Sequence, residues 1–185
     1  MPIPDTLIPA FSREQIAVAV ETLARRISAD YAGRDLLLVG VLKGSFMFLA
    51  DLVRALTIPA EVDFVRLASY GAGIASSGAV QITKDLETTI EGRDVIVVED
   101  IVDTGQTLRF LLDLRRLRHP PSLKVCALVD KPGRRAVEVP VDYVGFPEAS
   151  GFLVGYGLDL NERYRLLPAI YRIEGAPSLP DQSAG

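Results

Sequence analysis

The pattern of apolar and polar positions begins with a helix. Behind Ser12, apolar side chains recur every three or four residues, at Ile16, Val20, Leu23, Ala24 and Ile27. That spacing places them on one face of an α-helix. Ser12 followed three residues later by Gln15 is typical of a capping box, so we predict a first helix from about Ser12 to Asp30.

Shorter runs of apolar residues predict strands that are buried on both faces of a sheet. The chain contains three of them, Leu36 to Val41, Val95 to Val98 and the mostly apolar Leu123 to Val129. A fourth segment, Glu61 to Ser69, alternates in part between polar and apolar residues. This alternation predicts a further strand.

Helical spacing returns after two of these strands, from Phe46 to Leu56 and from about Thr104 to Leu117. The alternation of strand, helix and strand predicts an α/β fold, with a mainly parallel central sheet flanked by helices. No repeat or linker divides the chain, so we expect a single domain over residues 1–174. Residues 175–185 are rich in Pro, Ser, Gly and Ala, which predicts a disordered C-terminal tail.

The composition is that of an ordinary globular protein. Of 185 residues, 49% are hydrophobic and 24% are charged, and the formal net charge is −4. A chain of this length can bury a substantial core in one domain. The acidic balance differs from the basic surfaces typical of nucleic-acid-binding proteins, so we expect no nucleic-acid partner.

Single residues narrow the chemistry further. The one cysteine, Cys126, lies in an apolar run, and no disulfide can form within the chain, which fits a reducing compartment. The one histidine, His119, precedes two prolines and indicates a surface or helix-end residue rather than a metal ligand. No apolar stretch approaches the roughly 18 residues of a membrane helix, and the N-terminus lacks a signal-peptide pattern. We therefore expect a cytoplasmic protein without a membrane partner.

The segment from Val95 to Thr107 carries the strongest functional pattern. Its apolar run is followed at once by Glu99 and Asp100, then by the loop Asp103-Thr104-Gly105-Gln106-Thr107 and a helix. In open parallel sheets, ligands bind where a strand passes into a helix. A loop of small residues at a helix start offers backbone N–H groups to a phosphate, and paired carboxylates suit sugar hydroxyls or Mg²⁺. The segment therefore predicts a sugar-phosphate site with a metal nearby.

A purely structural alternative is a buried strand followed by a polar turn and a helix that Thr104 caps. This alternative accounts for Thr104 and Gly105. It does not account for Glu99, Asp100 and Asp103, because three like charges at one strand end repel one another. We therefore favour a ligand site.

Residues 98–105, Val-Glu-Asp-Ile-Val-Asp-Thr-Gly, resemble the phosphoribosyl-diphosphate (PRPP) signature of type I phosphoribosyltransferases, and the hypoxanthine-guanine branch in particular. The resemblance implies the fold of that family, with a small hood over the base site. It also implies that Glu99 and Asp100 hold Mg²⁺ and the ribose hydroxyls of PRPP. Asp103, Thr104, Gly105, Gln106 and Thr107 would bind the 5′-phosphate, and Asp103 would also be the catalytic base near purine N7.

Two further segments take their roles from this resemblance. Leu42-Lys43-Gly44-Ser45 taken alone is typical of a tight turn in which Ser45 caps the next helix. In the family, the matching loop binds pyrophosphate through backbone amides and has an unusual cis peptide bond before the lysine. Ser69 and Tyr70 resemble the Ser-Tyr pair of the family's mobile lid. The alternative, a disordered surface loop over Tyr70 to Gly78, predicts the same mobility and differs only in not becoming ordered over substrate.

The candidate purine-binding residues follow in the order expected for the family. Lys131, in an Asp-Lys-Pro-x-Arg-Arg run, would ordinarily be exposed, but the resemblance implies that it donates to purine O6. Adenine would be disfavoured, because its amino group is also a donor. By the same resemblance, Phe152 stacks on the base and Leu153 contacts its edge through the backbone. Asp159 would lie at the base and hold a second Mg²⁺, and Arg165 would contact pyrophosphate, although basic residues near a chain end are usually exposed.

One segment departs from the family pattern. Between Phe146 and Phe152 the family commonly has an Ile-Pro-Asp turn, whereas this chain has Pro-Glu-Ala-Ser-Gly over 147–151. The length is kept but the turn chemistry differs. The resemblance otherwise covers roughly Leu7 to Ile173.

The resemblance implies an Mg²⁺-dependent purine salvage enzyme. PRPP and a 6-oxopurine, hypoxanthine or guanine, would give IMP or GMP and pyrophosphate. The altered turn leaves a preference for xanthine as an alternative. A regulatory RNA-binding protein on the same fold is a second one, which the acidic charge disfavours. The expected assembly is a homodimer or homotetramer.

Overall fold

The computed structural model describes residues 7–69, 80–116 and 118–174. Its main sheet consists of β2 (Leu36–Leu42), β3 (Glu61–Ser69), β4 (Val80–Lys84), β5 (Asp94–Val102), β6 (Ser122–Asp130) and β7 (Tyr143–Phe146). The strand order is β4-β3-β2-β5-β6-β7. All neighbours run parallel except β4, which is antiparallel to β3 at one edge. The predicted mainly parallel sheet is confirmed.

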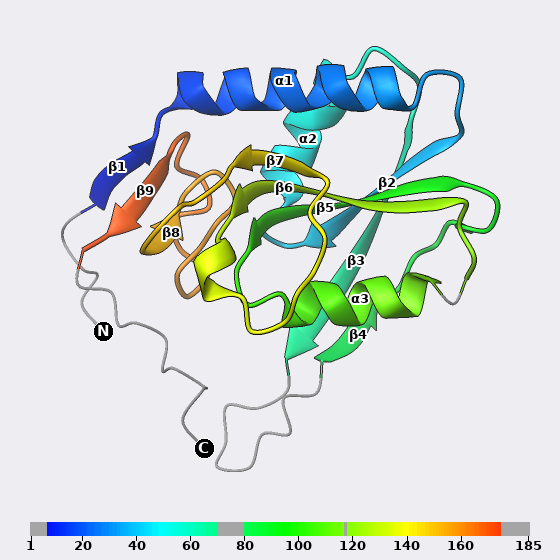
Figure 1. Ribbon diagram of the computed structural model, residues 1–185. Coiled ribbons are helices and arrows are strands. Elements are labelled where there is room, and N and C mark those ends of the chain that lie inside the picture. Colours follow the sequence, from blue (N-terminus) through cyan, green and yellow to red (C-terminus); the bar gives the residue numbers. More distant parts are fainter. Residues whose placement is uncertain (1–6, 70–79, 117, 175–185) are drawn as a thin grey trace.

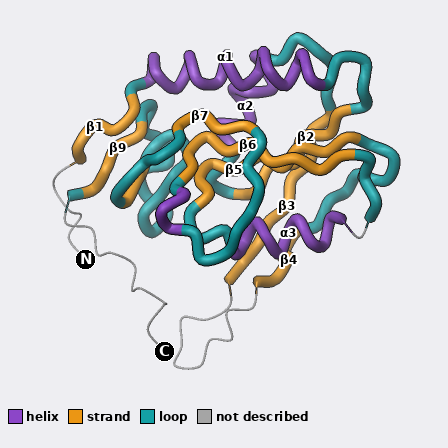
Figure 2. The backbone as a smooth tube through the Cα atoms, viewed as in Figure 1, coloured by secondary structure: helices purple, strands orange, loops and turns teal. Residues whose placement is uncertain are grey.

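Helices cover both faces of this sheet (Figure 1). The helices α1 (Arg13–Asp30) and α2 (Phe46–Ala55) lie on one face, and α3 (Gln106–Arg116) lies on the other. Figure 2, with helices in purple and strands in orange, shows the same three-layer order. The buried side chains accordingly form two clusters, one on each side of the sheet. None of the helices in the described ranges is long and apolar enough to cross a lipid bilayer.

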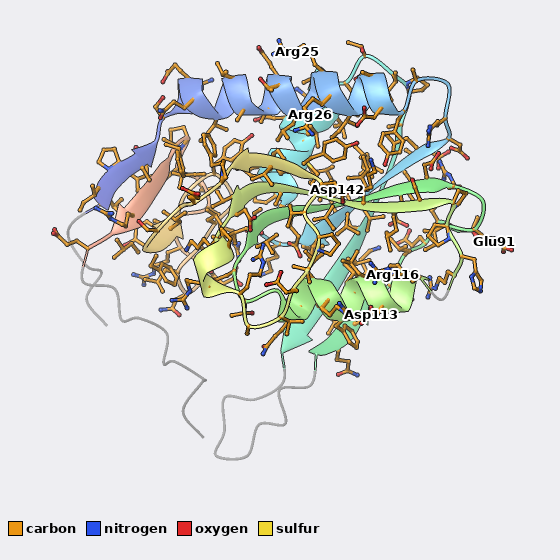
Figure 3. The ribbon with its side chains drawn as sticks, viewed as in Figure 1. Arg25, Arg26, Glu91, Asp113, Arg116 and Asp142 are labelled. Atoms are coloured by element: carbon orange, nitrogen blue, oxygen red, sulfur yellow. The ribbon has the colours of Figure 1, made fainter. Side chains whose placement is uncertain are left out.

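The helix α1 forms as its sequence predicts. Ser12 accepts a hydrogen bond from the backbone N–H of Gln15, and the Gln15 side chain accepts one from Ser12 in return. The predicted apolar stripe of the helix is buried. Figure 3 shows Arg25 pointing outward and Arg26 pointing toward the sheet, where its guanidinium lies 5.3 Å from the centre of the Tyr143 ring. The helix therefore covers the sheet with one face only.

Both single residues lie where they were predicted. Cys126 is a buried residue of β6, and burial raises the pKa of its thiol. His119 is exposed shortly after α3, and its backbone N–H donates to Arg116 O at 3.1 Å.

Three details of the predicted local structure are wrong. β5 does not end at Val98 but continues to Val102, because β6 pairs with it that far, so the acidic pair belongs to the strand. Ser45 has helical backbone angles and makes no capping hydrogen bond; its Oγ instead donates to Val41 O at 2.7 Å. The helix α3 begins at Gln106 rather than at residue 104, because Gly105 has a φ of +83°, which an α-helix does not contain.

A second, three-stranded sheet lies beside the main one (Figure 1). It consists of β1 (Leu7–Phe11), β9 (Ile170–Ile173) and β8 (Phe152–Val154), antiparallel in that order. It therefore brings together segments from opposite ends of the described chain. This sheet corresponds to the hood that the resemblance implied, although the polar and apolar pattern did not predict its strands.

The strand order has a switch point between β2 and β5. The crossover through α2 leads from β2 to β3, and the crossover through α3 leads from β5 to β6 on the other side. The two crossovers diverge and place their helices on opposite faces. Open α/β sheets bind ligands at such a switch point, at the carboxyl ends of the strands. The fold therefore predicts a ligand site at residues 42–45 and 103–107.

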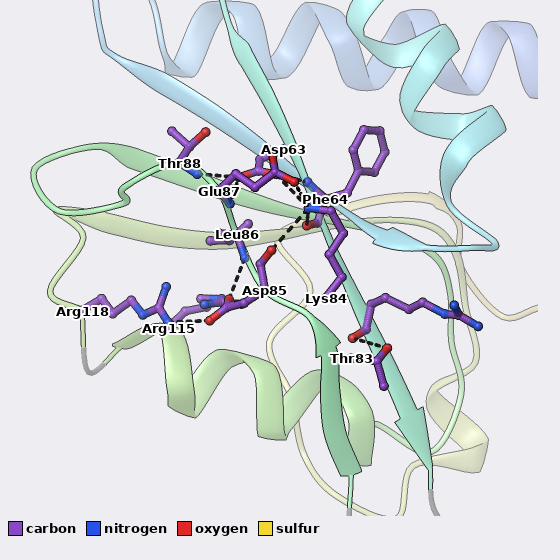
Figure 4. Close-up of polar contacts among 11 residues, drawn as sticks. Asp63, Phe64, Thr83, Lys84, Asp85, Leu86, Glu87, Thr88, Arg115 and Arg118 are labelled. Atoms are coloured by element: carbon purple, nitrogen blue, oxygen red, sulfur yellow. Dashed lines mark hydrogen bonds and ion pairs between the residues drawn. The ribbon is translucent and has the colours of Figure 1, made fainter.

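Asp85 joins the end of β4 to the end of α3 (Figure 4). Its carboxylate accepts hydrogen bonds from Arg115 Nη2 at 2.6 Å and from Arg118 Nη2 at 2.7 Å. Arg115 is 1% exposed, and within the described ranges its guanidinium donates to Asp85 alone. Burial acts to raise the pKa of Asp85, but the hydrogen bonds from Arg118, the Leu86 N–H and Arg115 outweigh it and lower the pKa to about 2.

We expect Asp85→Ala to lower the free energy of unfolding by about 3 kcal/mol at neutral pH, because the buried Arg115 charge loses its partner. The folded-state pKa of Asp85 lies below its ordinary value of 3.8. The ionised carboxylate therefore stabilises the fold above about pH 4, and this contribution is lost as the pH falls toward about 2. Urea unfolding at pH 7 and pH 3 measures both effects, and the difference between variant and wild type should narrow at pH 3.

The control for this prediction is Asp113→Ala, which removes an exposed ion-paired carboxylate from α3. We expect it to change the free energy of unfolding by less than about 0.5 kcal/mol. Equal losses in the two variants would contradict the role given to Asp85.

Candidate active site

Four polar segments meet at one edge of the main sheet. They follow β2, β5, β6 and β7, whose carboxyl ends point the same way because these strands are parallel. The segments are residues 42–45, 103–107, 131–135 and 147–151. Each was singled out in the sequence, and the sheet brings all four to the edge where ligands of open α/β sheets bind.

Glu99 and Asp100 form an acidic pair near the end of β5. Glu99 is 7% exposed, and burial together with the charge of Asp100 raises its pKa well above the ordinary value. Burial also raises the pKa of Asp100 to about 6, although backbone N–H groups and the nearby Arg165 act in the opposite direction. Such carboxyl groups favour a ligand that donates hydrogen bonds or brings positive charge. Sugar hydroxyls and Mg²⁺ both meet that requirement.

Gly44 allows the loop after β2 to touch Asp100. A methyl group on Gly44 would lie 1.7 Å from Asp100 Oδ2, so a larger residue would require the Asp100 side chain to move. From another side, a methyl group on Gly157 would lie 2.1 Å from the Gly44 carbonyl oxygen, and the φ of +99° at Gly157 also favours glycine. The peptide bond between Leu42 and Lys43 in this loop is cis, as the resemblance implied. The candidate pyrophosphate loop and the acidic pair are therefore in direct contact.

Arg165 lies within this site rather than on the surface. Its side chain is 16% exposed, Nη1 donates to Gly157 O at 2.7 Å, and Nη2 lies 2.9 Å from Asp159 Oδ1. Glu162 pairs both with Lys43 at 2.9 Å and with Arg165 at 3.3 Å. The expectation that a basic residue near the chain end is exposed is wrong here, because the bonds to Gly157 hold Arg165 beside the loop after β2.

Residues 103–107 form the turn that leads into α3. A methyl group on Gly105 would lie 2.5 Å from Val137 O, and the positive φ of this residue also favours glycine. Thr104 and Gln106 are exposed, and Thr107 is partly buried. The first backbone N–H groups of a helix have no partner within it, which makes this turn suited to an anion such as a phosphate.

Lys131 lies buried just beyond β6, with an exposure of 5%, and its Nζ donates to Gly151 O at 2.7 Å. Burial lowers the pKa of this lysine. Phe152 and Leu153 follow Gly151 as the first residues of β8; Phe152 is partly exposed and Leu153 is buried. The candidate purine-binding side chains therefore converge on one short segment of the three-stranded sheet.

Two arginines contact the end of β5, and the sequence alone assigned neither a role. Arg134 Nε donates to Asp103 Oδ1 at 2.8 Å. The side chain of Arg135 is 8% exposed, donates to the carbonyls of Val102 at 2.8 Å and Asp103 at 2.7 Å, and pairs with Asp130. The Arg-Arg dipeptide after the lysine was visible, but only the fold reveals which strand end it contacts.

The turn between β7 and β8 is fastened through its backbone. The Ala149 N–H donates to Asp130 O at 3.3 Å, and the Gly151 carbonyl accepts the hydrogen bond from the buried lysine. Glu148 and Gly151 have φ values of 66° and 74°. The side chains of Glu148 and Ser150 are exposed. The turn is therefore held by these backbone groups and by the partly buried Ala149, which packs against the core.

The acidic groups fit a divalent metal that a substrate helps to bind. In residues 7–69, 80–116 and 118–174, no three Asp, Glu, His or Cys side chains make a ready-formed metal site. Glu99, Asp100 and Asp159 nevertheless supply carboxylate oxygens, the donors that Mg²⁺ prefers, and Asp159 adds to the electrostatic cost of ionising Asp100. Because Mg²⁺ commonly takes one or two carboxylates plus waters and substrate phosphates, this donor set fits that ion.

Two predictions fall wholly or partly outside the described residues. Ser69 is the last residue of β3 and pairs through its backbone with Val80. Tyr70, the other lid candidate, lies outside the described ranges, as do the rest of the loop to Gly78 and the tail over 175–185.

Comparisons with known proteins agree with this geometry. The model of one family, the phosphoribosyl transferase domain, matches residues 11–161. The hypoxanthine phosphoribosyltransferase of Escherichia coli (strain K12) is 47% identical over 161 residues, which cover 86% of this chain and 90% of the relative. A hypoxanthine-guanine phosphoribosyltransferase of Streptococcus agalactiae is 48% identical over 160 residues, covering 86% of this chain and 89% of the relative.

Solved structures give the same result. The crystal structure of a hypoxanthine-guanine phosphoribosyltransferase from Bacillus anthracis has a TM-score of 0.83 and 42% identity, and the match covers 90% of this chain and 98% of that one. A hypoxanthine phosphoribosyltransferase from Staphylococcus aureus has a TM-score of 0.85 and 40% identity, with 90% of both chains covered.

Proposed function

Because this chain belongs to the phosphoribosyltransferase family, we propose that it transfers the 5-phosphoribosyl group of PRPP to hypoxanthine and guanine. The products are IMP or GMP and pyrophosphate, and the reaction belongs to purine salvage. The observation that carries the proposal is the contact of Asp100, beside the buried Glu99, with the glycine loop after β2, at the sheet edge that also holds a buried lysine.

The sugar and the two phosphate ends of PRPP are assigned to three parts of the site. Residues 103–107 bind the 5′-phosphate through backbone N–H groups and hydroxyls. Glu99 and Asp100 accept hydrogen bonds from the ribose hydroxyls. These bonds offset the cost of ionising the two carboxyl groups, whose pKa values burial raises. Residues 42–44 and Arg165 bind the pyrophosphate, and their N–H groups and positive charge stabilise it as it leaves.

Mg²⁺ is the proposed cofactor. Glu99 and Asp100 would hold one ion together with oxygen atoms of PRPP, and Asp159 would hold a second. When bound, Mg²⁺ neutralises the negative charge that develops on the departing pyrophosphate.

The purine is placed by the segment at the start of β8 and by Lys131. Phe152 stacks on the base, which contributes about 1–3 kcal/mol, and the Leu153 backbone contacts the edge of the base. Lys131 Nζ donates to O6, and a lowered pKa does not remove this role, because both the ammonium and the amine carry N–H donors. Adenine is rejected, because its amino group would face this donor with a second donor.

In the transfer step, the bond from C1′ to pyrophosphate breaks as the bond from purine N9 to C1′ forms. Asp103 accepts or stabilises the proton at N7 while charge moves through the base. Much of the rate comes from holding the two substrates in line at one sheet edge. Ser69 and Tyr70 are proposed to belong to a lid that excludes water from the ribosyl cation-like transition state.

Two wider expectations stay part of this proposal. We propose that the protein works in the cytoplasm and assembles as a homodimer or homotetramer, since symmetric association is the common state of soluble enzymes. Its small-molecule partners are PRPP and the 6-oxopurine.

The proposal is tested by incubating the purified protein with PRPP and Mg²⁺ and offering hypoxanthine, guanine, xanthine, adenine and uracil separately. We expect nucleotide and pyrophosphate from hypoxanthine and guanine, and none from adenine or uracil. A clear preference for xanthine would overturn the assignment of hypoxanthine and guanine as the purine substrates. If no base reacts while folded protein still binds PRPP by calorimetry, the transferase assignment is wrong and the sugar-phosphate site stands.

A further inference from the structure

The proposed base, Asp103, is held by an arginine from a neighbouring loop. Its Oδ1 accepts a hydrogen bond from Arg134 Nε at 2.8 Å, and the side chains are 31% and 47% exposed. No hydrogen bond from a described residue reaches the other carboxylate oxygen, Oδ2. The carboxylate therefore has one oxygen engaged by the protein and one available to a ligand.

The backbone that carries Arg134 is fixed relative to Asp103. Arg134 ends a short 3-10 helix (Pro132–Arg134) that directly follows Lys131. The Lys131 N–H donates to Val102 O at 3.0 Å, and the N–H groups two and three residues past Arg134 both donate to Thr104 O, at 3.0 and 3.1 Å. Together with the bonds from Arg135 to Val102 and Asp103, these contacts fasten the loop on both sides of Arg134. The backbone at both ends of the ion pair is therefore held in place by joined loops.

We propose that Arg134 is a positioning residue for the transfer reaction, which holds Oδ1 of Asp103 and so presents Oδ2 to the N7 proton of the purine. The inference rests on the proposed function, because it assumes that Asp103 is the base. Without such a bond, the carboxylate turns about its terminal torsion angle, and its two oxygens are interchangeable. A single planar N–H donor at Oδ1 removes that freedom, and a reacting group held in the productive orientation reacts faster.

The pair of Arg134 and Asp103 should differ from an ordinary surface ion pair in what its loss changes. Exposed ion pairs contribute little to stability, so loss of Arg134 should hardly change the melting temperature. It should change the rate, because it alters the orientation of the reacting oxygen. The purine and PRPP contact other residues, so their binding should change little.

The experiment measures kcat, and KM for hypoxanthine and PRPP, in wild type, Arg134→Ala and Arg134→Lys, each also in an Asp103→Asn background. We expect Arg134→Ala to lower kcat about tenfold with both KM values changed less than twofold. Arg134→Lys should restore only part of the rate, because an ammonium lacks the fixed planar donor. In the Asp103→Asn background, Arg134→Ala should have no further effect, since residues that act as a unit are not additive.

Arg116→Ala is the matched control. Arg116 is 51% exposed and pairs with Asp113, and its loss also removes one positive charge. Figure 3 labels both residues on α3. We expect its kcat to equal that of wild type. An equal loss of kcat in Arg116→Ala and Arg134→Ala would mean that charge alone is responsible and would overturn the inference.

Other outcomes separate this inference from the proposed function. If Asp103→Asn lowers kcat but Arg134→Ala does not, the inference fails and the base assignment stands. The inference also fails if Arg134→Ala lowers kcat by the same factor in the wild-type and the Asp103→Asn backgrounds. If Asp103→Asn keeps full activity, the base assignment fails, and the inference fails with it.

Discussion

Asp103→Asn should lower kcat by about 10²- to 10⁴-fold, the range that a general base typically contributes. The change is nearly isosteric, so the turn before α3 keeps its shape and its N–H groups remain available to the 5′-phosphate. The amide has lost the negative charge that stabilises the N7 proton. The affinity for PRPP, measured by calorimetry with Mg²⁺ present, should therefore change far less than the rate.

Steady-state kinetics on the purified variant provides the comparison. Single-turnover measurements confirm that the affected step is the transfer itself rather than product release. Losses of equal size in kcat and in PRPP affinity would show that Asp103 serves binding only. Its position, one residue past β5 and within hydrogen-bond distance of Arg134, would then be a structural feature of the loop.

Lys131→Ala should raise KM for hypoxanthine by about 10- to 100-fold, because a hydrogen bond to a charged donor contributes about 1.5–3 kcal/mol. Because the lysine is only 5% exposed, water does not readily replace its hydrogen bond to the purine. KM for PRPP should change less than twofold. The discrimination against adenine should fall as well, because the donor that opposes its amino group is gone.

Lys131→Met separates the donor from the packing of the side chain. Methionine keeps most of the length and apolar surface of lysine but donates no hydrogen bond. It should lose purine affinity as the alanine variant does. Wild-type purine affinity in the methionine variant would show that Lys131 contributes only packing next to Gly151.

The parts of the fold that could be predicted from the sequence are those with a strong local pattern. The capping box at Ser12 and the buried strands give clear signals because one helix face or both sheet faces must be apolar. The strands β1, β4, β7, β8 and β9 were not predicted, because each is only three to five residues long. The pairing of β1 with β9 also joins the two ends of the described chain. The end of β5 was misplaced because β6 continues to pair with it past two charged residues.

The site could be predicted where its residues belong to a family motif. The structure brings together the acidic pair, the loop around Gly44 and Arg165, although each role remains a proposal. Glu162 and Arg134 were missed because an exposed charge in sequence has many possible partners, and only the fold selects one. The names of the relatives support hypoxanthine and guanine and give no support to a xanthine enzyme or an RNA-binding regulator.

The backbone anchoring of the turn between β7 and β8 determines where this protein tolerates redesign. The Ala149 N–H donates to Asp130 O and the Gly151 carbonyl accepts from Lys131, whereas the side chains of Glu148 and Ser150 face solvent. Gly44 and Gly157 instead leave no space for even one carbon atom. A directed-evolution library aimed at other bases should therefore randomise positions 148 and 150 and keep the codons of Gly44, Gly151 and Gly157 fixed. In such a library, most turn variants would remain folded while the surface that borders the base is varied.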